Sequence, residues 1–205
     1  LREKTGAGMM DCKKALTESG GDMAKAEEYL QKKSLASADK RAGKIAAEGA
    51  IGSYVHGGRI GVLVEINSET DFVGRNEDFQ ALVKDICLHV AAANPEFLDD
   101  SQIPEDAVAK QKEIFLAQQE DAGKPANILE RIVEGKIAKW KKERCLLDQA
   151  FVKDTDKTVD QYVREVAGRL KEKISIRRFV RFELGEGIEK QADDFAAEVA
   201  AAAQV

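Results

Sequence analysis

Two runs of β-type residues joined by a glycine turn most constrain what this chain can fold into. Residues 50–55 and 59–66 flank the turn His56-Gly57-Gly58, where glycines supply the positive φ that a tight hairpin needs. In the second run apolar residues alternate, so one face of that strand is apolar. These alternating residues are Ile60, Val62, Val64 and Ile66. The pattern predicts an antiparallel hairpin whose apolar face must be covered by other elements.

Two segments with apolar residues at helical spacing can provide that cover. The first begins near Asn76 and ends around Pro95, and the second begins at about residue 159. Their apolar stripes are Phe79, Leu82, Val83, Ile86 and Val90 in the first, and Val159, Tyr162, Val163, Val166 and Leu170 in the second. A further strand is predicted over 174–184, after an irregular stretch at 145–155. We therefore expect an α+β core, formed by residues 50–102 and 144–187, with helices packed on a small antiparallel sheet.

The predicted strand at 174–184 mixes apolar residues with arginines. Arg177, Arg178 and Arg181 form a basic run, which fits either a nucleic-acid face or an edge or one-sided strand with solvated arginines. The chain has 32 Lys and Arg against 37 Asp and Glu, a net charge of −5, so it has no large basic field to neutralise phosphates. The second interpretation is therefore favoured, and direct binding of nucleic acid is not expected.

The first 33 residues predict a small helical module. Gly20-Gly21 separates two amphipathic stretches, and Asp22 is placed as the N-cap of the second. We expect a three-helix bundle of the UBA-like type over residues 1–33, with part of its surface free for docking. Met9 and Met10 open its second helix, and each is either core filler or an adaptable contact. Adjacent helical residues point about 100° apart, so at least one of the two should face outward.

Three further segments complete the predicted domain organisation. Residues 34–49, rich in Ala, Lys, Ser and Arg, predict a linker helix at a domain boundary. Residues 103–143 contain two charged helices joined at Gly123-Lys124-Pro125, with only a narrow apolar seam. A protruding antiparallel coiled-coil hairpin is favoured there over two surface helices packed on the core, which usually show a wider apolar face. Residues 188–205 predict a C-terminal helix that docks on the body or on a partner.

A polar loop between the hairpin and the first core helix carries a single aromatic residue. Its sequence is Thr70-Asp71-Phe72-Val73. Composition alone favours Phe72 as a residue folded back to cap the core, because aromatic residues are usually buried. The alternative is an aromatic wedge, held on a rigid scaffold and pressed into another protein as a binding hot spot. The residues alone leave both interpretations open.

Several classes of function leave no mark in the sequence. No P-loop, GxGxxG, HExxH or GxSxG motif is present, and Cys12, Cys87 and Cys145 form no CxxC pair. No cofactor, metal site or disulfide framework is expected. His56 and His89 have no partner at catalytic spacing, so we do not expect an enzyme. The sequence has no run of eighteen apolar residues and no signal-peptide core, so we expect an intracellular protein without membrane contact.

Several stretches, taken together and in this order, resemble the elongation factor Ts family of bacteria and their derived organelles. They are LREKTGAGMMDCKKAL at 1–16, the segment 49–61 with HGGRIG, TDFV at 70–73, VEGK at 133–136 and RFELGEGIEK at 181–190. The resemblance covers essentially the whole chain. It implies a guanine-nucleotide exchange factor for elongation factor Tu, acting in translation elongation in the cytoplasm or, in an organelle, in a compartment such as the plastid stroma.

The resemblance also implies roles for individual residues. The TDFV loop would carry the exchange activity, with Phe72 entering the GTPase domain of the partner near its magnesium and phosphate site and Asp71 supporting the contact. Met9 and Met10 would contact the same domain, and the turn His56-Gly57 would contact another domain of the GTPase. The hairpin at 103–143 would be the helical hairpin of the family, and the C-terminal helix a further docking element.

This chain departs from the family pattern in two ways. Long members carry two related α/β subdomains in the core, whereas this chain has one set of strands and resembles the short form. Some short members dimerise, so a homodimer that restores a second subdomain is a further expectation. Leu170-Lys171 also stands where the family often has Ile-Gly, ahead of Glu172-Lys173. A partner contact made by that Ile-Gly pair is therefore not carried over to this chain.

Overall fold

A three-stranded antiparallel sheet is the centre of the fold. The computed structural model describes residues 1–118 and 126–188. The sheet contains β1 (Glu48–His56), β2 (Ile60–Ser68) and β5 (Ile174–Glu183), in the order β1-β2-β5. The predicted hairpin is confirmed, because β1 pairs with β2 from Glu48 opposite Ser68 to His56 opposite Ile60. Three of the alternating residues of β2 are buried, namely Val62, Val64 and Ile66.

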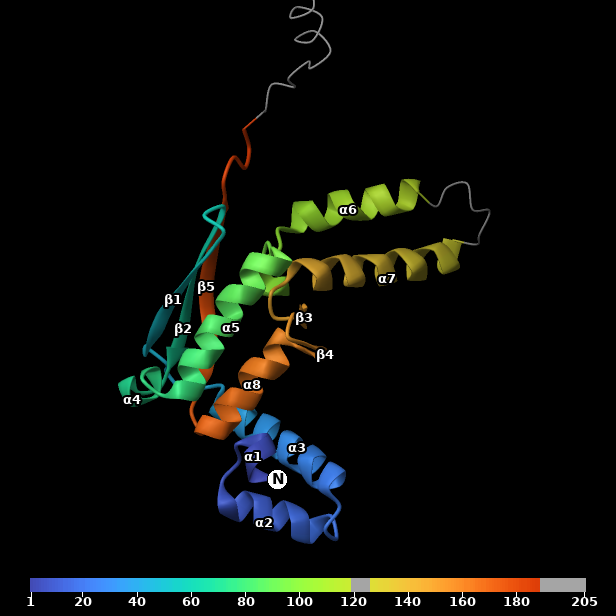
Figure 1. Ribbon diagram of the computed structural model, residues 1–205. Helices are drawn as coiled ribbons and strands as arrows, with labels where there is room; N and C mark the ends of the chain where they lie inside the picture. The colour runs from blue at the N-terminus through green and yellow to red at the C-terminus, as the bar shows by residue number, and fades with distance from the viewer. Residues whose placement is uncertain (119–125, 189–205) are drawn as a thin grey trace, which may run out of the picture.

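Helices α5 (Glu77–Ala93) and α8 (Val159–Leu170) cover one face of this sheet (Figure 1). The predicted stripe of α5 is buried throughout, and Asn76 caps the helix by accepting a hydrogen bond from the backbone N–H of Asp78. Gly52 lets α5 come close, because a Cβ there would lie 2.3 Å from Cγ1 of Val83. The chain therefore has the α+β fold that the sequence predicts.

The predicted arginine strand, β5, lies at one edge of the sheet and contains a β-bulge. Glu65 of β2 pairs with Arg178 while the adjacent Ile66 pairs with Ile176, so Arg177 is the extra residue. The side chains of Arg177 and Arg178 both bond to Glu65, at 2.9 and 2.6 Å, on the exposed face. Two of the three arginines are thus solvated, as predicted, whereas the side chain of Arg181 is only 10% exposed.

Residues 145–155 are more regular than the sequence suggests. They include β3 (Ala150–Phe151), which pairs with β4 (Asp154–Thr158) to form a second, two-stranded sheet. The ring of Phe151 is buried and stacks on Tyr162 of α8 at a centroid distance of 4.5 Å. The short strands were missed because their pairing depends on this contact and not on a local alternation of apolar residues.

The N-terminal module contains α1 (Arg2–Thr5), α2 (Met9–Glu18) and α3 (Met23–Arg41) around a small core. Helix α3 runs without interruption across the boundary predicted at residue 34 and ends seven residues before β1 begins at Glu48. Its second half packs on α8, where Gly168 allows the closest approach: a Cβ there would lie 2.0 Å from Oγ of Ser34. The small residues in this half of α3 therefore serve close packing between helices.

A helical arm projects from the body beside the end of α5 (Figure 1). The chain passes through a short 3₁₀ helix, Asp100–Gln102, into α6 (Glu105–Ala117), and returns along α7 (Ala126–Arg144). No residue of α6 is buried, while Val133 of α7 is fully buried. The predicted Gly123-Lys124-Pro125 turn and all of the predicted C-terminal helix except Ile188 lie outside the described residues.

Candidate functional site

Phe72 lies on a single helical turn, α4 (Asp71–Gly74), between β2 and α5. Its side chain is 81% exposed, which excludes the interpretation of Phe72 as a core cap. Thr70, the residue before the turn, and Asp71 are also exposed, and Val73 is half-buried against the core. A large aromatic side chain exposed on a loop that a scaffold holds is a candidate binding residue, so Phe72 is the first candidate here.

The end of the turn is seated directly on the sheet. Gly74 is buried against Gly49 of β1, and a Cβ on Gly74 would lie 3.0 Å from the carbonyl oxygen of Gly49. Gly49 itself has φ +127°, and a Cβ there would lie 2.1 Å from the carbonyl oxygen of Ile66. The side chain of Gln80 also donates a hydrogen bond of 2.5 Å to the carbonyl oxygen of Gly74. The backbone that follows Phe72 is therefore closely held.

The start of the turn is held by a carboxylate from a distant part of the chain. Glu172, in the turn between α8 and β5, accepts two hydrogen bonds from Thr70: one from its N–H at 3.1 Å and one from its Oγ1 at 2.6 Å. The Thr70 side chain makes no capping hydrogen bond to α4. Ser68 donates from Oγ to the carbonyl oxygen of Thr70 at 2.9 Å.

Glu69, next to Thr70, connects the loop to two other segments. Its carboxylate bonds to Arg41 at 3.0 Å and to Lys44 at 2.7 Å, both at the end of α3 or just after it. It also accepts a hydrogen bond of 2.6 Å from the backbone N–H of Lys173. Its side chain is only 14% exposed. The Lys44 ammonium and the Lys173 N–H, with Arg41, lower the pKa of Glu69 to about 2.

The other residues implied by the resemblance lie at separate places. Met9 and Met10 open α2 and are both exposed, so the core-filler interpretation is excluded for both side chains. His56 and Gly57 lie at the β1–β2 turn, at the far end of the sheet from α4 (Figure 1). Strands of nine residues span about 30 Å, so a single small ligand could not bridge these places, whereas a large protein partner could.

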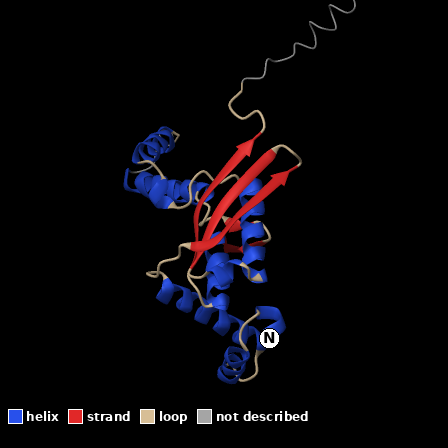
Figure 2. Cartoon of the chain, turned by 90° about the vertical axis from the view of Figure 1, so that its left-hand side faces the viewer, coloured by secondary structure: helices blue, strands red, loops and turns tan. Residues whose placement is uncertain are grey.

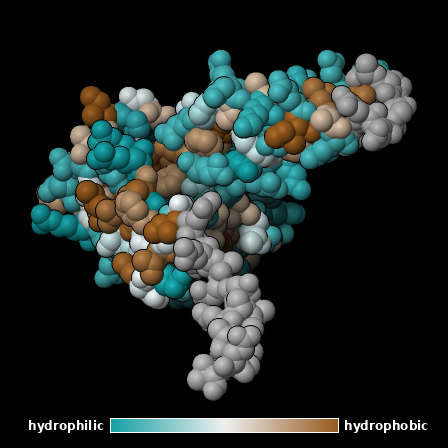
Figure 3. Space-filling model, turned by 90° about the horizontal axis from the view of Figure 1, so that it is seen from above, coloured by the Kyte–Doolittle hydropathy of each residue, from teal (hydrophilic) through white to brown (hydrophobic). Residues whose placement is uncertain are grey.

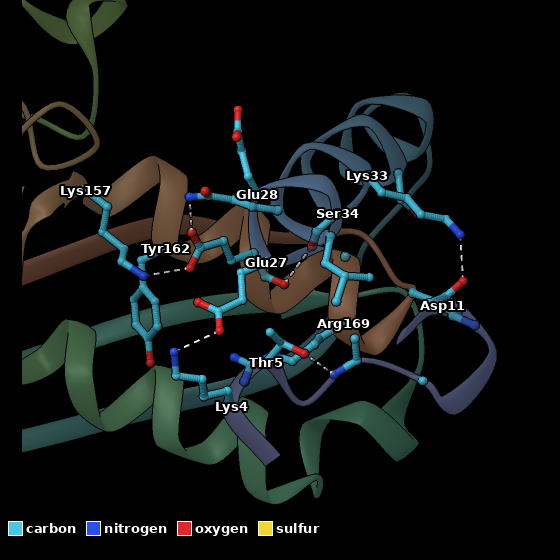
Figure 4. Close-up of a pocket in the computed structure, with 18 of the residues that line it drawn as sticks. Lys4, Thr5, Asp11, Glu27, Glu28, Lys33, Ser34, Lys157, Tyr162 and Arg169 are labelled. Atoms are coloured by element: carbon cyan, nitrogen blue, oxygen red, sulfur yellow. Dashed lines mark hydrogen bonds and ion pairs between the residues drawn. The ribbon is translucent and has the colours of Figure 1, made fainter. Parts of the chain in front are cut away.

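A cleft of about 790 Å³ lies among α1, the start of α2, α3 and α8, beside the contact between α3 and α8 (Figure 4). Charged side chains line it, and several are already paired with each other: Lys4 with Glu27 at 2.8 Å, and Lys33 with Asp11 at 2.6 Å. These pairs are partly exposed and weak individually. The cleft shows that the N-terminal module meets the core mainly through α3.

Among residues 1–118 and 126–188 no helix covers the outer face of the sheet, and the strands are seen directly in Figure 2. Several large apolar side chains are exposed there or at its end, namely Val55, Leu63, Val180, Phe182 and Leu184. Apolar residues also gather on the surface of the body in Figure 3, on the side away from the arm. An exposed apolar surface of this kind is typical of a protein contact.

The remaining chemistry-bearing residues have structural roles. His89 is fully buried: its Nε2 bonds to Oε1 of Gln149 at 2.9 Å and its Nδ1 accepts from the N–H of Val152 at 3.2 Å. Burial lowers the pKa of His89 and raises the pKa values of Cys87 and Cys145 to about 11. Within residues 1–118 and 126–188, no three His, Cys, Asp or Glu residues group as metal ligands, and no helix is long and apolar enough to cross a membrane.

The sequence pointed to Phe72 but not to the residues that hold its loop. Glu69, Glu172 and the pair Gly49 and Gly74 act through contacts between segments far apart in the chain, and Glu172 is 102 residues from Thr70. No local pattern signals such a pairing. An exposed aromatic side chain on a backbone segment bonded at both ends is a candidate for a protein-binding residue.

Comparison with known proteins gives the family. The model of the family described as elongation factor TS matches residues 37–186. Elongation factor Ts of Desulforamulus reducens is 61% identical over 98% of this chain and 93% of its own length, and that of Geobacter metallireducens is 59% identical over 99% and 94%. That of Myxococcus xanthus is 56% identical over 98% and 92%. The chain belongs to the elongation factor Ts family, and its role is in translation elongation.

Proposed function

We propose that this chain is a guanine-nucleotide exchange factor for elongation factor Tu and that Phe72 is its wedge. The observation that supports this most directly is the 81% exposure of Phe72 on a loop seated at Gly49 and tied to Glu172. Phe72 enters the GTPase domain near the magnesium and phosphate site, and Asp71 supports the contact. No bond is made or broken.

The mechanism is one of differential binding. Exchange requires that the factor bind the nucleotide-free GTPase more tightly than the nucleotide-bound form, and by linkage the nucleotide and the factor weaken each other equally. A Phe that displaces magnesium ligands or the phosphate loop gives this difference, because the wedge and a properly seated Mg-GDP exclude each other. Met9, Met10 and the His56-Gly57 turn supply the rest of the contact. Their wide separation matches a large, multidomain protein partner.

The same surface features argue against RNA as the primary partner. The arginines of β5 would be its binding face, yet Arg177 and Arg178 are both paired with Glu65. These contacts lower the pKa of Glu65, so its charge persists well below neutral pH. We therefore expect this chain to bind RNA weakly, with an affinity that depends little on salt concentration. We also expect it to act in the cytoplasm, where translation elongation takes place.

We also propose that the chain can form a homodimer. The support is the outer face of the three-stranded sheet, which no helix of the described residues covers and on which Leu63, Val180 and Phe182 are exposed. A second copy would cover this apolar surface. Sedimentation equilibrium of the isolated chain at micromolar concentration tests this, and a monomer at all concentrations would contradict it.

Release of labelled GDP from elongation factor Tu tests the exchange function. We expect the chain to accelerate release and Phe72→Ala to reduce that acceleration roughly thirty-fold, since a hot-spot Phe contributes about 2 kcal/mol. The fold should not change, because Phe72 is exposed. If the variant exchanges nucleotide as fast as the wild type, the proposed role of Phe72 is wrong. If the wild-type chain has no effect, the exchange function itself is wrong.

A further inference from the structure

Two carboxylates hold the start of the exchange loop, the segment Thr70–Gly74: one bonds to Thr70 and the other belongs to the residue before it. Glu69 is the residue immediately before the loop, and Glu172 reaches it from the α8–β5 turn. Glu172 takes two hydrogen bonds from Thr70, while Glu69 takes an N–H from Lys173, the residue next to Glu172. The α8–β5 turn therefore accepts hydrogen bonds from Thr70 and donates one to Glu69.

The loop needs such support because α4 is only one turn long. A single helical turn is unstable alone, since the backbone entropy lost in forming it exceeds the gain from its first hydrogen bond. The contact of Gly74 with Gly49 holds the end of the turn. At its start Thr70 and Asp71 are exposed, and Ser68 supports the backbone there through its hydrogen bond to the carbonyl oxygen of Thr70. Glu172 adds two hydrogen bonds to Thr70, and Glu69, the residue before the loop, bonds to Arg41, Lys44 and Lys173.

We propose that Glu69 and Glu172 are positioning residues of the exchange loop, which join its start to the end of α3 and to the α8–β5 turn and so fix the direction in which Phe72 points. This proposal rests on the exchange function proposed above and deepens it. Neither carboxylate needs to touch the GTPase. Their role is to keep the backbone of the loop in one conformation when Phe72 contacts the GTPase.

The third segment of this connection is α3. Arg41, the last residue of α3, bonds to Glu69, and Lys173 donates from Nζ to the carbonyl oxygen of Lys44 at 2.7 Å. The opposite end of α3 belongs to the N-terminal module that carries Met9 and Met10. Through Glu69 the loop is therefore fixed relative to the helix that positions the other predicted contact on the GTPase domain.

The free chain allows a test that does not depend on exchange. We expect backbone ¹⁵N order parameters of residues 71–74 of about 0.85 in the wild type and below about 0.6 in Glu172→Ala. Glu172→Gln keeps one acceptor oxygen, so it should lie between the two. Glu69→Gln loses its charge pairs with Arg41 and Lys44 and should also loosen the loop.

Glu65→Gln is the matched control. Glu65 lies on β2, four residues before Glu69. Its side chain is also 14% exposed and also pairs with two cations, Arg177 and Arg178, but it has no bond to the loop. It should therefore lose as much ion pairing as Glu69→Gln without changing the order of residues 71–74. Equal loosening of the loop in both variants would show a general loss of stability and overturn the proposal.

The kinetic test uses release of labelled GDP from elongation factor Tu at increasing concentrations of each variant. Glu172→Ala should lower the maximal release rate roughly tenfold, as expected when a charged acceptor is removed, and change the half-saturating concentration less than about twofold. Glu172→Gln should recover part of the rate. A normal maximal rate for Glu172→Ala overturns the proposal, whether or not the loop is loosened. If the wild-type chain itself fails to release GDP, the exchange function is wrong, and the order parameters still decide whether the carboxylates position the loop.

Discussion

The exchange loop and the helical arm both expose apolar side chains, but they are supported in different ways. Phe72 leaves a turn that is seated on Gly49 at one end and bonded to Glu172 at the other. On the arm, Ile114 and Ile128 are exposed on two helices, and α6 has no buried residue at all. An exposed side chain can displace part of another protein only if its own backbone keeps its conformation during the contact. The comparison therefore separates a side chain on a backbone bonded at both ends from side chains on helices of which one, α6, has no buried residue.

The largest effect should come from removing the seat of the loop. Gly49→Ala would place a Cβ 2.1 Å from the carbonyl oxygen of Ile66, at a φ of +127° that alanine adopts only with strain. We expect a loss of about 3 kcal/mol in the free energy of unfolding, from strain and overpacking together. Urea denaturation measures this loss.

Gly43→Ala is the control for that experiment. Gly43 has open space where a Cβ would be added, so its variant should stay within about 0.5 kcal/mol of the wild type. A Gly49→Ala protein as stable as the control would mean that β1 does not approach β2 at Gly49 as described, and the residue on which Gly74 rests would then not be fixed in this way.

The second prediction concerns the arm itself. Amides of α6 should exchange with solvent at least about tenfold faster than those of α5, because local opening of α6 exposes little buried surface whereas α5 opens only with the core. Hydrogen exchange followed by mass spectrometry or NMR gives both rates in one sample. Equal protection of α6 and α5 would show that the arm is as firmly held as the core.

A smaller effect is expected in the turn that positions Glu172. Lys171 has φ +59°, a left-handed conformation that costs a non-glycine residue free energy. Lys171→Gly, the residue that the family often has there, should stabilise the chain by about 0.5–1 kcal/mol without moving Glu172. Thermal unfolding measures the gain.

Asn94→Gly provides the comparison for Lys171→Gly. Asn94 also has a positive φ, of 47°, but Asn tolerates this conformation better than Lys. Its variant should gain clearly less stability. If both variants gain equally, the strain at Lys171 is not specific to its side chain.

The last prediction is a pH dependence limited to the loop. The pKa of Glu69 lies at about 2 in the folded chain and near its ordinary value of 4.5 in the unfolded chain. Because the folded pKa is the lower one, the contribution of Glu69 is complete above about pH 4.5 and is lost as the pH falls towards 2. NMR titration of the Glu69 carboxyl group should give this low midpoint. Glu69→Gln should remove the corresponding shift at Thr70, and a midpoint near 4.5 in the wild type would contradict the contacts with Arg41 and Lys44.

The sequence predicts elements that depend on local pattern and misses contacts that depend on the fold. The alternation of β2 and the spacing of Phe79 and Val90 are local, so the sheet and its covering helix could be predicted. The motif identified Phe72 as a site residue, but its exposure could not be derived, since composition favoured burial. Glu172 could not be found at all, because its bond to Thr70 joins residues 102 positions apart. The sequence around a glycine such as Gly168 also does not indicate which helix will pack against it.

The uninterrupted helix α3 fixes both the distance and the relative rotation between the N-terminal module and the exchange loop. Its 19 residues span about 28 Å, from the module that carries Met9 and Met10 to Arg41 beside the exchange loop. Each residue added to or removed from this helix would shift the module by about 1.5 Å and turn it by about 100°. Surface substitutions along α3 should therefore be tolerated, while a single insertion would point the methionines away from the side of the molecule on which they now lie. Selection on this segment should preserve the number of residues more strictly than their identity.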